Sequence, residues 1–370
     1  MGNELIALGG AFLAAGVLAR LGRRVGLPTI PFFMAAGILF GPNTPGIVLI
    51  EDVGELSLLA ALGLILLLFH LGLEFSLGDL VGGGRRLLYA GGAYLALNVG
   101  GGFVFGLLLG WGTPEALVVA GAVGISSSAI VTKLLVELRR LANPESRLIL
   151  GIIVVEDVFL ALYLAILQPV LGGAEGFAGG LVQFSKAFAF LLVALTAVAR
   201  YGSRLVGRIV ASGDDELLTV CFIGVAVLVA GLGEELGVSD AIGAFMAGLI
   251  IAETSVADRV ERLVLPLRDA FAALFFFAFG LTIDPGDIAR VAVPVAAAVG
   301  LSLVLNLVAG LVAARMHGFG AQPAANIGLT VLGRGEFSLI LATLAAAAGL
   351  DDRIGPFVAL YVLILAIAGP

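Results

Sequence analysis

The stretch that decides the fold is LILGIIVVEDVFLALYLAIL (148–167), whose only charged residues are the adjacent acids Glu156 and Asp157. About 20 apolar residues are what an α-helix needs to cross a bilayer. A carboxylate near the bilayer centre costs roughly 2.5–3.5 kcal/mol on insertion scales, so packing alone does not explain two of them. Carboxylates at this depth serve proton relays and cation pathways. We predict that this pair is the functional centre.

The composition indicates an integral membrane protein. Of the 370 residues, 60% are hydrophobic and 13% are charged, whereas soluble domains carry about 25% charged residues. The single cysteine, Cys221, excludes disulfides and cysteine-based metal sites. The two histidines, His70 and His317, are too few and too far apart for a transition-metal site. We find no set of nucleophile and base, and we expect no enzymatic activity, no cofactor and no nucleic-acid partner.

Hydrophobic runs between charged, Gly and Pro residues predict about 13 membrane spans. The predicted spans are roughly 4–22, 28–46, 54–77, 84–110, 113–138, 145–170, 180–208, 215–235, 238–253, 259–282, 289–316, 322–348 and 353–369. With the N-terminus outside, nearly all arginines fall on the inner side, as the positive-inside rule requires. We therefore expect a multi-pass protein of the cell membrane, surrounded by lipid, with its C-terminus in the cytoplasm.

The sequence repeats itself at a displacement of about 208 residues. The stretch FHLGLEFSLGDL (69–80) aligns with FAFGLTIDPGDI (277–288), and FFMAAGIL (32–39) resembles AFMAGLII (244–251) at a slightly different offset. Spans two, three and four thus pair with spans nine, ten and eleven. The two copies are offset by seven spans. Because seven is an odd number, the second copy is inverted in the membrane, and inverted repeats are typical of secondary transporters. The fold class that we predict is an all-α membrane protein with two inverted-topology repeats.

Two corresponding spans contain residues that interrupt helices. GISSSAIV (124–131) lies opposite GRGEFSLI (333–340) in the repeat register. Gly lowers helix stability, and Ser offers the backbone alternative hydrogen bonds. We predict two crossed broken helices, whose half-helix ends direct partial charges at an ion site. Ser126, Ser127 and Ser128 offer oxygen ligands to a small cation, while Arg334 and Glu336 neutralise helix dipoles or neighbouring acids.

An unpaired arginine is not tenable inside a membrane span, so we expect Arg334 to have a carboxylate partner. The candidates are Glu156, Glu336 and Glu74, and Glu156 is the preferred one. If Glu156 stays ionised and bound to Arg334, only Asp157 titrates. On that reading, one proton exchanges for one monovalent cation without net charge movement.

Two further polar residues, Asn98 and Asn306, occupy corresponding positions inside spans four and eleven. We expect them to support the site by bonding to the broken helices. The acid pair has no such counterpart, because its repeat positions are Ile364 and Leu365. The sequence therefore predicts one ion site per chain.

The sequence resembles the cation:proton antiporter superfamily over essentially its whole length, in particular the Kef-like and NapA-like branch. The motifs that carry the resemblance are HLGLEF (70–75), GISSSAIV (124–131), VVEDVF (154–159), IGAFMAGLIIAE (242–253), LFFFAFGLTID (274–284) and GRGEF (333–337). The resemblance implies a homodimer that works by an elevator-like movement. It implies a dimerisation region of about 1–80 and 215–283, a core transport region of about 84–170 and 289–370, and a connector helix of about 180–208.

Asp157 matches the family's ion-binding aspartate, and Glu156 matches the variable position before it. Two features depart from the family pattern: this position is usually Asp, Asn or Gln, and span eleven has only Ser302 and Asn306 where NapA-like members have a lysine. Kef-type proteins usually continue into a cytoplasmic nucleotide-binding regulatory domain, which would follow Pro370.

We therefore predict a monovalent cation/proton antiporter that works by alternating access. Asp157 would alternately hold a proton and a transient Na⁺ or K⁺ ion. The alternatives are a gated monovalent cation channel or efflux system and a sodium-coupled symporter, for instance of an organic anion. The paired acids and the single arginine within the spans argue against the symporter. The repeat and the acid pair argue against the channel.

Overall fold

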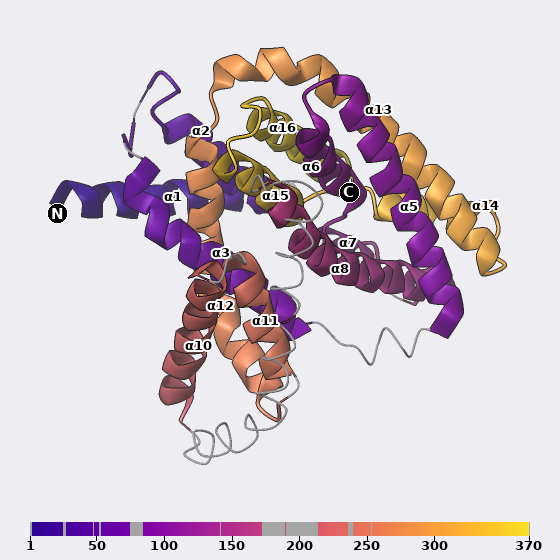
Figure 1. The fold of residues 1–370 in the computed structure, drawn as a ribbon, viewed down its shortest axis with the longest axis horizontal. Helices are drawn as coiled ribbons and strands as arrows, with labels where there is room; N and C mark the ends of the chain where they lie inside the picture. Colours follow the sequence, from indigo (N-terminus) through magenta and orange to yellow (C-terminus); the bar gives the residue numbers. More distant parts are fainter. Residues whose placement is uncertain are drawn as a thin grey trace. The chain divides into compact units, whose positions relative to one another are not determined.

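In the residues that it describes, the computed structural model consists of helices and loops, without strands (Figure 1). The described residues are 2–24, 27–46, 48–51, 53–74, 84–140, 142–171, 189, 214–235, 240–252 and 254–369. The helices are α1 (Gly2–Arg24), α2 (Ile30–Phe40), the 3₁₀ turn η1 (Val53–Leu56), α3 (Ser57–Glu74), α5 (Gly84–Leu109), α6 (Thr113–Gly124), α7 (Ser128–Glu137), α8 (Pro144–Leu171), α10 (Asp215–Glu235), α11 (Asp240–Ala252), α12 (Ala257–Leu281), α13 (Pro285–Met316), α14 (Ala321–Thr330), α15 (Glu336–Ala347) and α16 (Ile354–Ala368).

These helices confirm the predicted multi-span architecture. Six of them are long and apolar enough to cross a membrane, and several others are shorter apolar helices of the kind that broken or packed spans form. Twelve of the predicted spans coincide with one helix or with two half-helices. The predicted connector, 180–208, lies outside the described residues except for residue 189.

Both predicted breaks are present. Helix α6 ends at Gly124 and α7 begins at Ser128, with extended backbone at Ile125. Helix α14 ends at Thr330, and α15 begins at Glu336 after non-helical backbone at Gly335. The chain stops being helical where Gly and Ser gather, as their weak helix propensity predicts.

Close glycine packing shows the repeat in three dimensions. In one copy α2 packs on α12 through Gly37 and Gly280, and in the other α11 packs on α3 through Gly248 and Gly72. A Cβ atom on Gly280 would lie 2.2 Å from a carbonyl oxygen of α2, and one on Gly72 would lie 2.1 Å from a carbonyl oxygen of α11. Gly72 and Gly280 are 208 positions apart, but Gly37 and Gly248 are 211 apart (248 − 37). For this segment the displacement between the two copies is therefore one residue smaller than in the predicted alignment of 32–39 with 244–251.

The same correspondence relates two other helix pairs, α5 with α6 and α13 with α14. A Cβ atom on Gly102 of α5 would lie 3.1 Å from the Cα of Ala120, and one on Gly310 of α13 would lie 2.9 Å from the Cα of Gly328. Both members are displaced by 208 positions (310 − 102 and 328 − 120). Small residues that let backbones approach closely are the usual basis of helix association in membranes.

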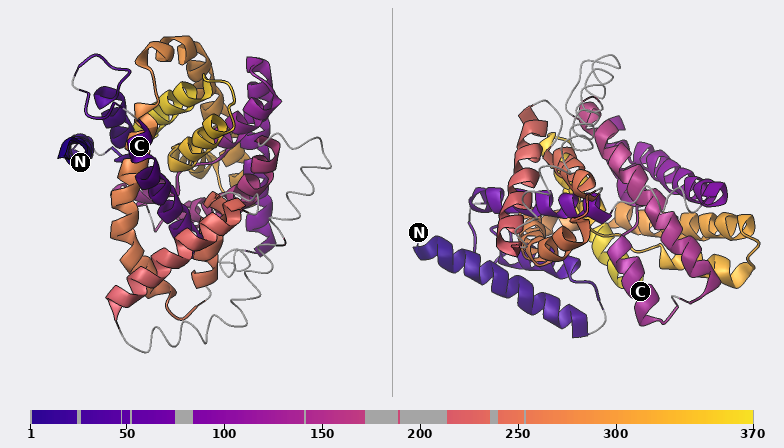
Figure 2. Two further views of the ribbon diagram at one scale, coloured as in Figure 1. Left: turned by 60° about the vertical axis from the view of Figure 1, so that its left-hand side comes forward. Right: turned by 90° about the horizontal axis from the view of Figure 1, so that it is seen from below.

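The chain divides into two compact units. The first comprises 1–55, 77–160 and 276–370, and it contains both broken helices and the acid pair. The second comprises 56–76 and 161–275, and α3, α10 and α11 pack together within it. Figure 2 gives two further views, in which α5 and α13 of the first unit run side by side. The functional division into dimerisation and core regions remains a prediction.

The glycine contacts yield a test of the packing. We expect Gly280→Ala to lower the free energy of unfolding by about 1–3 kcal/mol, because the added methyl group overpacks the contact with α2. Gly300→Ala on α13 is the matched control, since a Cβ atom there meets nothing within 4 Å. It should be neutral or gain up to about 1 kcal/mol of helix propensity. Thermal unfolding in detergent measures both variants, and equal melting temperatures would contradict the close packing.

Candidate functional site

The two breaks bind each other directly. The backbone amide of Ser127, between α6 and α7, donates a hydrogen bond of 3.0 Å to the carbonyl oxygen of Gly333, between α14 and α15. A Cβ atom on Gly335 would lie 2.6 Å from the side chain of Ser127, so the close approach requires glycine there. Non-helical backbone at membrane depth survives only where its polar groups are satisfied, and each break satisfies some of the polar groups of the other.

Arg334 caps the C-terminal ends of two half-helices at once. Its Nε and Nη2 atoms donate to the carbonyl oxygen of Val123 in the last turn of α6, at 3.0 and 2.6 Å. Its Nη1 atom donates to the carbonyl oxygens of Val331 and Leu332 at the end of α14, at 2.8 and 3.2 Å. Val123 and Val331 are 208 positions apart, so one fully buried guanidinium binds equivalent carbonyls of both repeats.

The opposite half-helix ends share a carboxylate. Glu336 is the first residue of α15, and its Oε2 accepts a hydrogen bond of 2.9 Å from the hydroxyl of Ser127. Ser127 directly precedes α7, and its hydroxyl oxygen accepts from the amide of Ile130 at 3.4 Å, as an N-cap does. The negative charge of Glu336 thus lies beside two positive helix N-termini. In addition, the hydroxyl of Ser338 donates to the carbonyl oxygen of Ala122 at 3.0 Å.

The acid pair lies on α8, and its two members have different surroundings. Glu156 is buried, with 1% of its surface exposed, and its Oε2 accepts a hydrogen bond from the hydroxyl of Ser126 in the first break. The other carboxylate oxygen, Oε1, is buried without a hydrogen-bond partner among the described residues. Asp157 is half-buried, as is Ser128. Since successive helical residues point about 100° apart, the two carboxyl groups face different neighbours.

The predicted ion pair between Arg334 and Glu156 is wrong. Arg334 donates its hydrogen bonds to backbone carbonyls, and no ion pair joins these two described residues. The physical reason lies in the helix ends. Each helix C-terminus carries about −0.5 elementary charge, so two of them balance a guanidinium about as well as one carboxylate. The expectation of electroneutral exchange rested on this pair and loses that basis.

Asn98 and Asn306 do not bond to the broken helices as predicted. The side-chain nitrogen of Asn306 donates to the side-chain oxygen of Asn98 at 3.1 Å, so the two repeat-related residues bond each other. Each also donates to the backbone carbonyl four residues earlier on its own helix, at 3.0 Å in α5 and 2.8 Å in α13. The pair therefore joins α5 to α13 at equivalent points of the two copies.

Sequence reasoning missed the tyrosines of this network. The hydroxyl of Tyr94 donates to the side-chain oxygen of Asn306, and Tyr361 on α16 shares a hydrogen bond of 2.7 Å with the hydroxyl of Ser302. All four of these side chains are fully buried. One signal was available in the sequence, because Tyr94 lies one helical turn before Asn98 and can therefore reach the same interface.

Glu74, the third candidate partner of Arg334, belongs to the second unit, where it lies 3.6 Å from His70.

Two contacting broken helices in an inverted-repeat fold, with Glu156 of the acid pair bonded to one break, define a secondary ion transporter. The chain belongs to the sodium/hydrogen exchanger family, whose transmembrane domain matches residues 10–370. This finding confirms the resemblance stated above.

Similar proteins agree with this assignment. The chain is 39% identical to the K⁺/H⁺ antiporter subunit KhtU of Bacillus subtilis, over 100% of this chain and 93% of KhtU. It is 29% identical to the ammonium/H⁺ antiporter subunit AmhT of Alkalihalophilus pseudofirmus, over 99% and 91%. The solved structure of the sodium proton antiporter MjNhaP1 from Methanocaldococcus jannaschii has the same fold, with a TM-score of 0.74 at 15% identity, covering 99% of this chain and 96% of that one.

The capping role of Arg334 can be tested separately from an ion pair. Arg334→Ala leaves carbonyls of two helix ends unpaired, at about 1–3 kcal/mol each, and should sharply lower the melting temperature in detergent. Arg334→Lys keeps the positive charge but loses the forked set of hydrogen-bond donors. Its melting temperature should therefore lie between those of the wild type and Arg334→Ala. Arg353→Ala, at a half-exposed arginine paired with Asp351, is the control and should have little effect. If Glu156→Gln restored the stability of Arg334→Ala, the carbonyl-capping role would be overturned in favour of an ion pair.

Proposed function

We propose that Asp157 carries out the cation/proton exchange of this family in this chain, by holding a proton and a monovalent cation in turn. The observation that carries the proposal is the hydrogen bond between Ser126 and Glu156, because it brings the acid-bearing helix α8 to the first break. Asp157 is the next residue and is half-buried. A group that must exchange with water in alternating access needs such partial exposure.

The surrounding residues suit this role by removing competing charges. Arg334 neutralises the negative ends of α6 and α14, and Glu336 lies at the positive ends of α7 and α15. The fixed charges of the breaks are thus balanced locally. The acids of α8, Glu156 and Asp157, then carry the charge that a proton or a cation has to compensate. Ser128, half-buried at the start of α7, would offer an oxygen ligand to the transported ion.

The transported cation is K⁺ or Na⁺. The name of KhtU supports K⁺, while that of AmhT shows that a relative similar over nearly the whole chain is assigned ammonium. Exchange in proteoliposomes with K⁺, Na⁺, Li⁺ and ammonium in turn, followed by a pH-sensitive dye inside the vesicles, identifies the substrate.

We further propose an arrangement in the membrane with the N-terminus outside and the C-terminus in the cytoplasm, supported by the distribution of arginines. Homodimerisation through residues 1–80 and 215–283 is proposed from the family resemblance. The word "subunit" in the names of both relatives says that those proteins belong to larger assemblies. A cytoplasmic regulatory domain or partner for this chain is proposed from the family resemblance. Cross-linking in membranes tests the dimer.

Replacing the carrier tests the central proposal. Asp157→Asn cannot release a proton or balance a cation, so exchange should fall to the background of empty vesicles while the melting temperature stays near that of the wild type. Asp287→Asn, which removes a carboxylate from the first turn of α13, is the matched control and should transport normally. Substantial exchange by a well-folded Asp157→Asn protein would refute the assignment.

Competition for one carboxylate has a characteristic pH dependence. When a proton and a cation bind the same group, the apparent cation affinity weakens about tenfold per pH unit below the pKa of the site. Initial rates of exchange at a series of cation concentrations, measured between about pH 5 and pH 9, give this slope. An affinity that stays constant across that range would indicate a channel or a separate proton route.

A further inference from the structure

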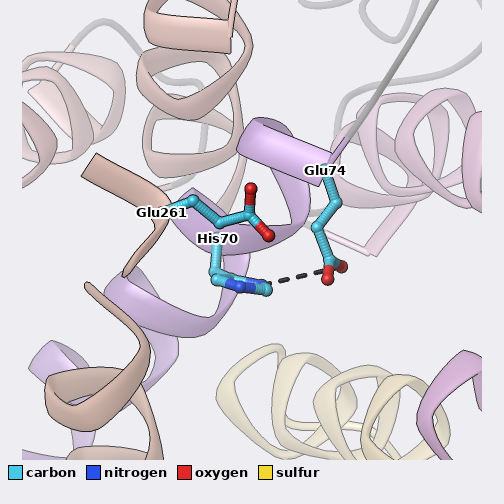
Figure 3. Close-up of side chains that lie close together, drawn as sticks. All are labelled: His70, Glu74 and Glu261. Atoms are coloured by element: carbon cyan, nitrogen blue, oxygen red, sulfur yellow. Dashed lines mark ion pairs between the residues drawn. The ribbon is translucent and has the colours of Figure 1, made fainter. Parts of the chain in front are cut away.

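A second cluster of ionisable side chains lies in the other unit, which contains none of the residues assigned to exchange. Figure 3 shows His70 and Glu74 of α3 converging with Glu261 of α12. One ligand atom from each, a ring nitrogen and two carboxylate oxygens, lies within 4.8 Å of the other two. His70 is buried, Glu261 is half-buried and Glu74 is exposed.

Packing against two neighbouring helices holds the backbone around His70 in place. His70 and Glu74 are four residues apart, so they lie on one face of α3. Phe69 stacks on Phe222 of α10 with ring centroids 5.8 Å apart, and Gly72 packs closely on Gly248 of α11. The turn of α3 that carries His70 is therefore held by close packing against α10 and α11. A ligand on a packed helix face is better preorganised than one on a loop.

Arg268 supplies the positive charge of this cluster in the structure. Its Nη1 atom lies 3.0 Å from Nδ1 and 3.4 Å from Nε2 of His70. The same guanidinium donates two hydrogen bonds, of 3.0 and 2.6 Å, to the exposed carboxylate of Asp269. Asp269 thus offers Arg268 a second anchor toward solvent, away from the imidazole.

We propose that His70, Glu74 and Glu261 form a binding site for a divalent transition-metal ion of the Zn²⁺ type, and that Arg268 competes with the metal for it. The number of histidines argued against a transition-metal site, but carboxylates supply the missing ligands here. One imidazole nitrogen and two carboxylate oxygens are a donor set that Zn²⁺ accepts, with water as the fourth ligand. Tetrahedral ligands at about 2.1 Å from the ion lie about 3.4 Å apart. Two flexible glutamates close the difference from 4.8 Å. A guanidinium has no lone pair for a metal, so Arg268 must leave and turn to Asp269.

If Arg268 competes with the metal, removing the positive charge of Arg268 should strengthen the binding of the metal ion. The experiment uses the full chain in detergent, without a polyhistidine tag, in a Cys221→Ser background that removes the only thiol. Zn²⁺ is titrated against a chelating dye, and Co²⁺ absorption reports the ligand set. We expect one Zn²⁺ per chain, an affinity at least about 100-fold weaker in His70→Gln and Glu261→Gln, and about tenfold tighter in Arg268→Gln.

The chain offers a matched control, because His317 is its only other histidine. His317→Gln should leave the affinity unchanged. In protein labelled with ¹⁵N-histidine, Zn²⁺ should shift the ring nitrogens of His70 and not those of His317. The proposal is overturned if His70→Gln binds Zn²⁺ as well as the wild type, if His317→Gln loses binding equally, or if Arg268→Gln binds more weakly. Arg268→Gln keeps all three ligands, so its result stands even if a ligand variant fails to fold.

Discussion

The structure of the first unit depends on one constraint, that backbone polar groups inside a membrane need partners. Breaking two helices leaves carbonyls without partners at the ends of α6 and α14, and amides without partners at the starts of α7 and α15. The lipid at that depth offers no hydrogen bonds that could satisfy them. Arg334 donates to the carbonyls of Val123 and Val331, and Ser127 joins the two breaks through its amide and its hydroxyl. The broken helices are thus possible only as a pair.

Residues that repeat in both copies and residues that occur in only one copy have different roles in this fold. The glycine contacts and the pair Asn98 and Asn306 repeat at corresponding positions, and they build the scaffold. The charges do not repeat: Arg334 corresponds to Ser126, and Glu336 corresponds to Ser128. The second copy therefore supplies the charges that cap both breaks, while the first copy supplies the acid pair. A duplicated fold acquires a single site in this way.

The sequence predicted those features that follow from local chemistry. Gly and Ser within apolar spans located both breaks, and the displacement of about 208 residues identified the equivalent helices. It did not predict partners that depend on where helix ends meet in space. The expected partner of Arg334 was a side chain of opposite charge, whereas its partners in the structure are backbone carbonyls, which every residue carries. The residue types at positions 123 and 331 hold no sign of this role. The bond between Asn98 and Asn306 likewise depends on the crossing of α5 and α13.

The partners of Arg334 also affect what a transport cycle costs. An arginine bound to Glu156 would tie the fixed charge of the breaks to the acid pair, and separating a buried ion pair costs about 3–5 kcal/mol. Capping by carbonyls keeps the positive charge on the breaks themselves. Glu156 is instead held by the hydroxyl of Ser126. Such a hydrogen bond contributes about 0.5–1.5 kcal/mol net when the acid is neutral and about 1.5–3 kcal/mol when it is charged. A hydroxyl can both donate and accept, so this contact persists whether the acid is charged or neutral. The acid pair can therefore change its protonation or its partner without dismantling the structure that supports it.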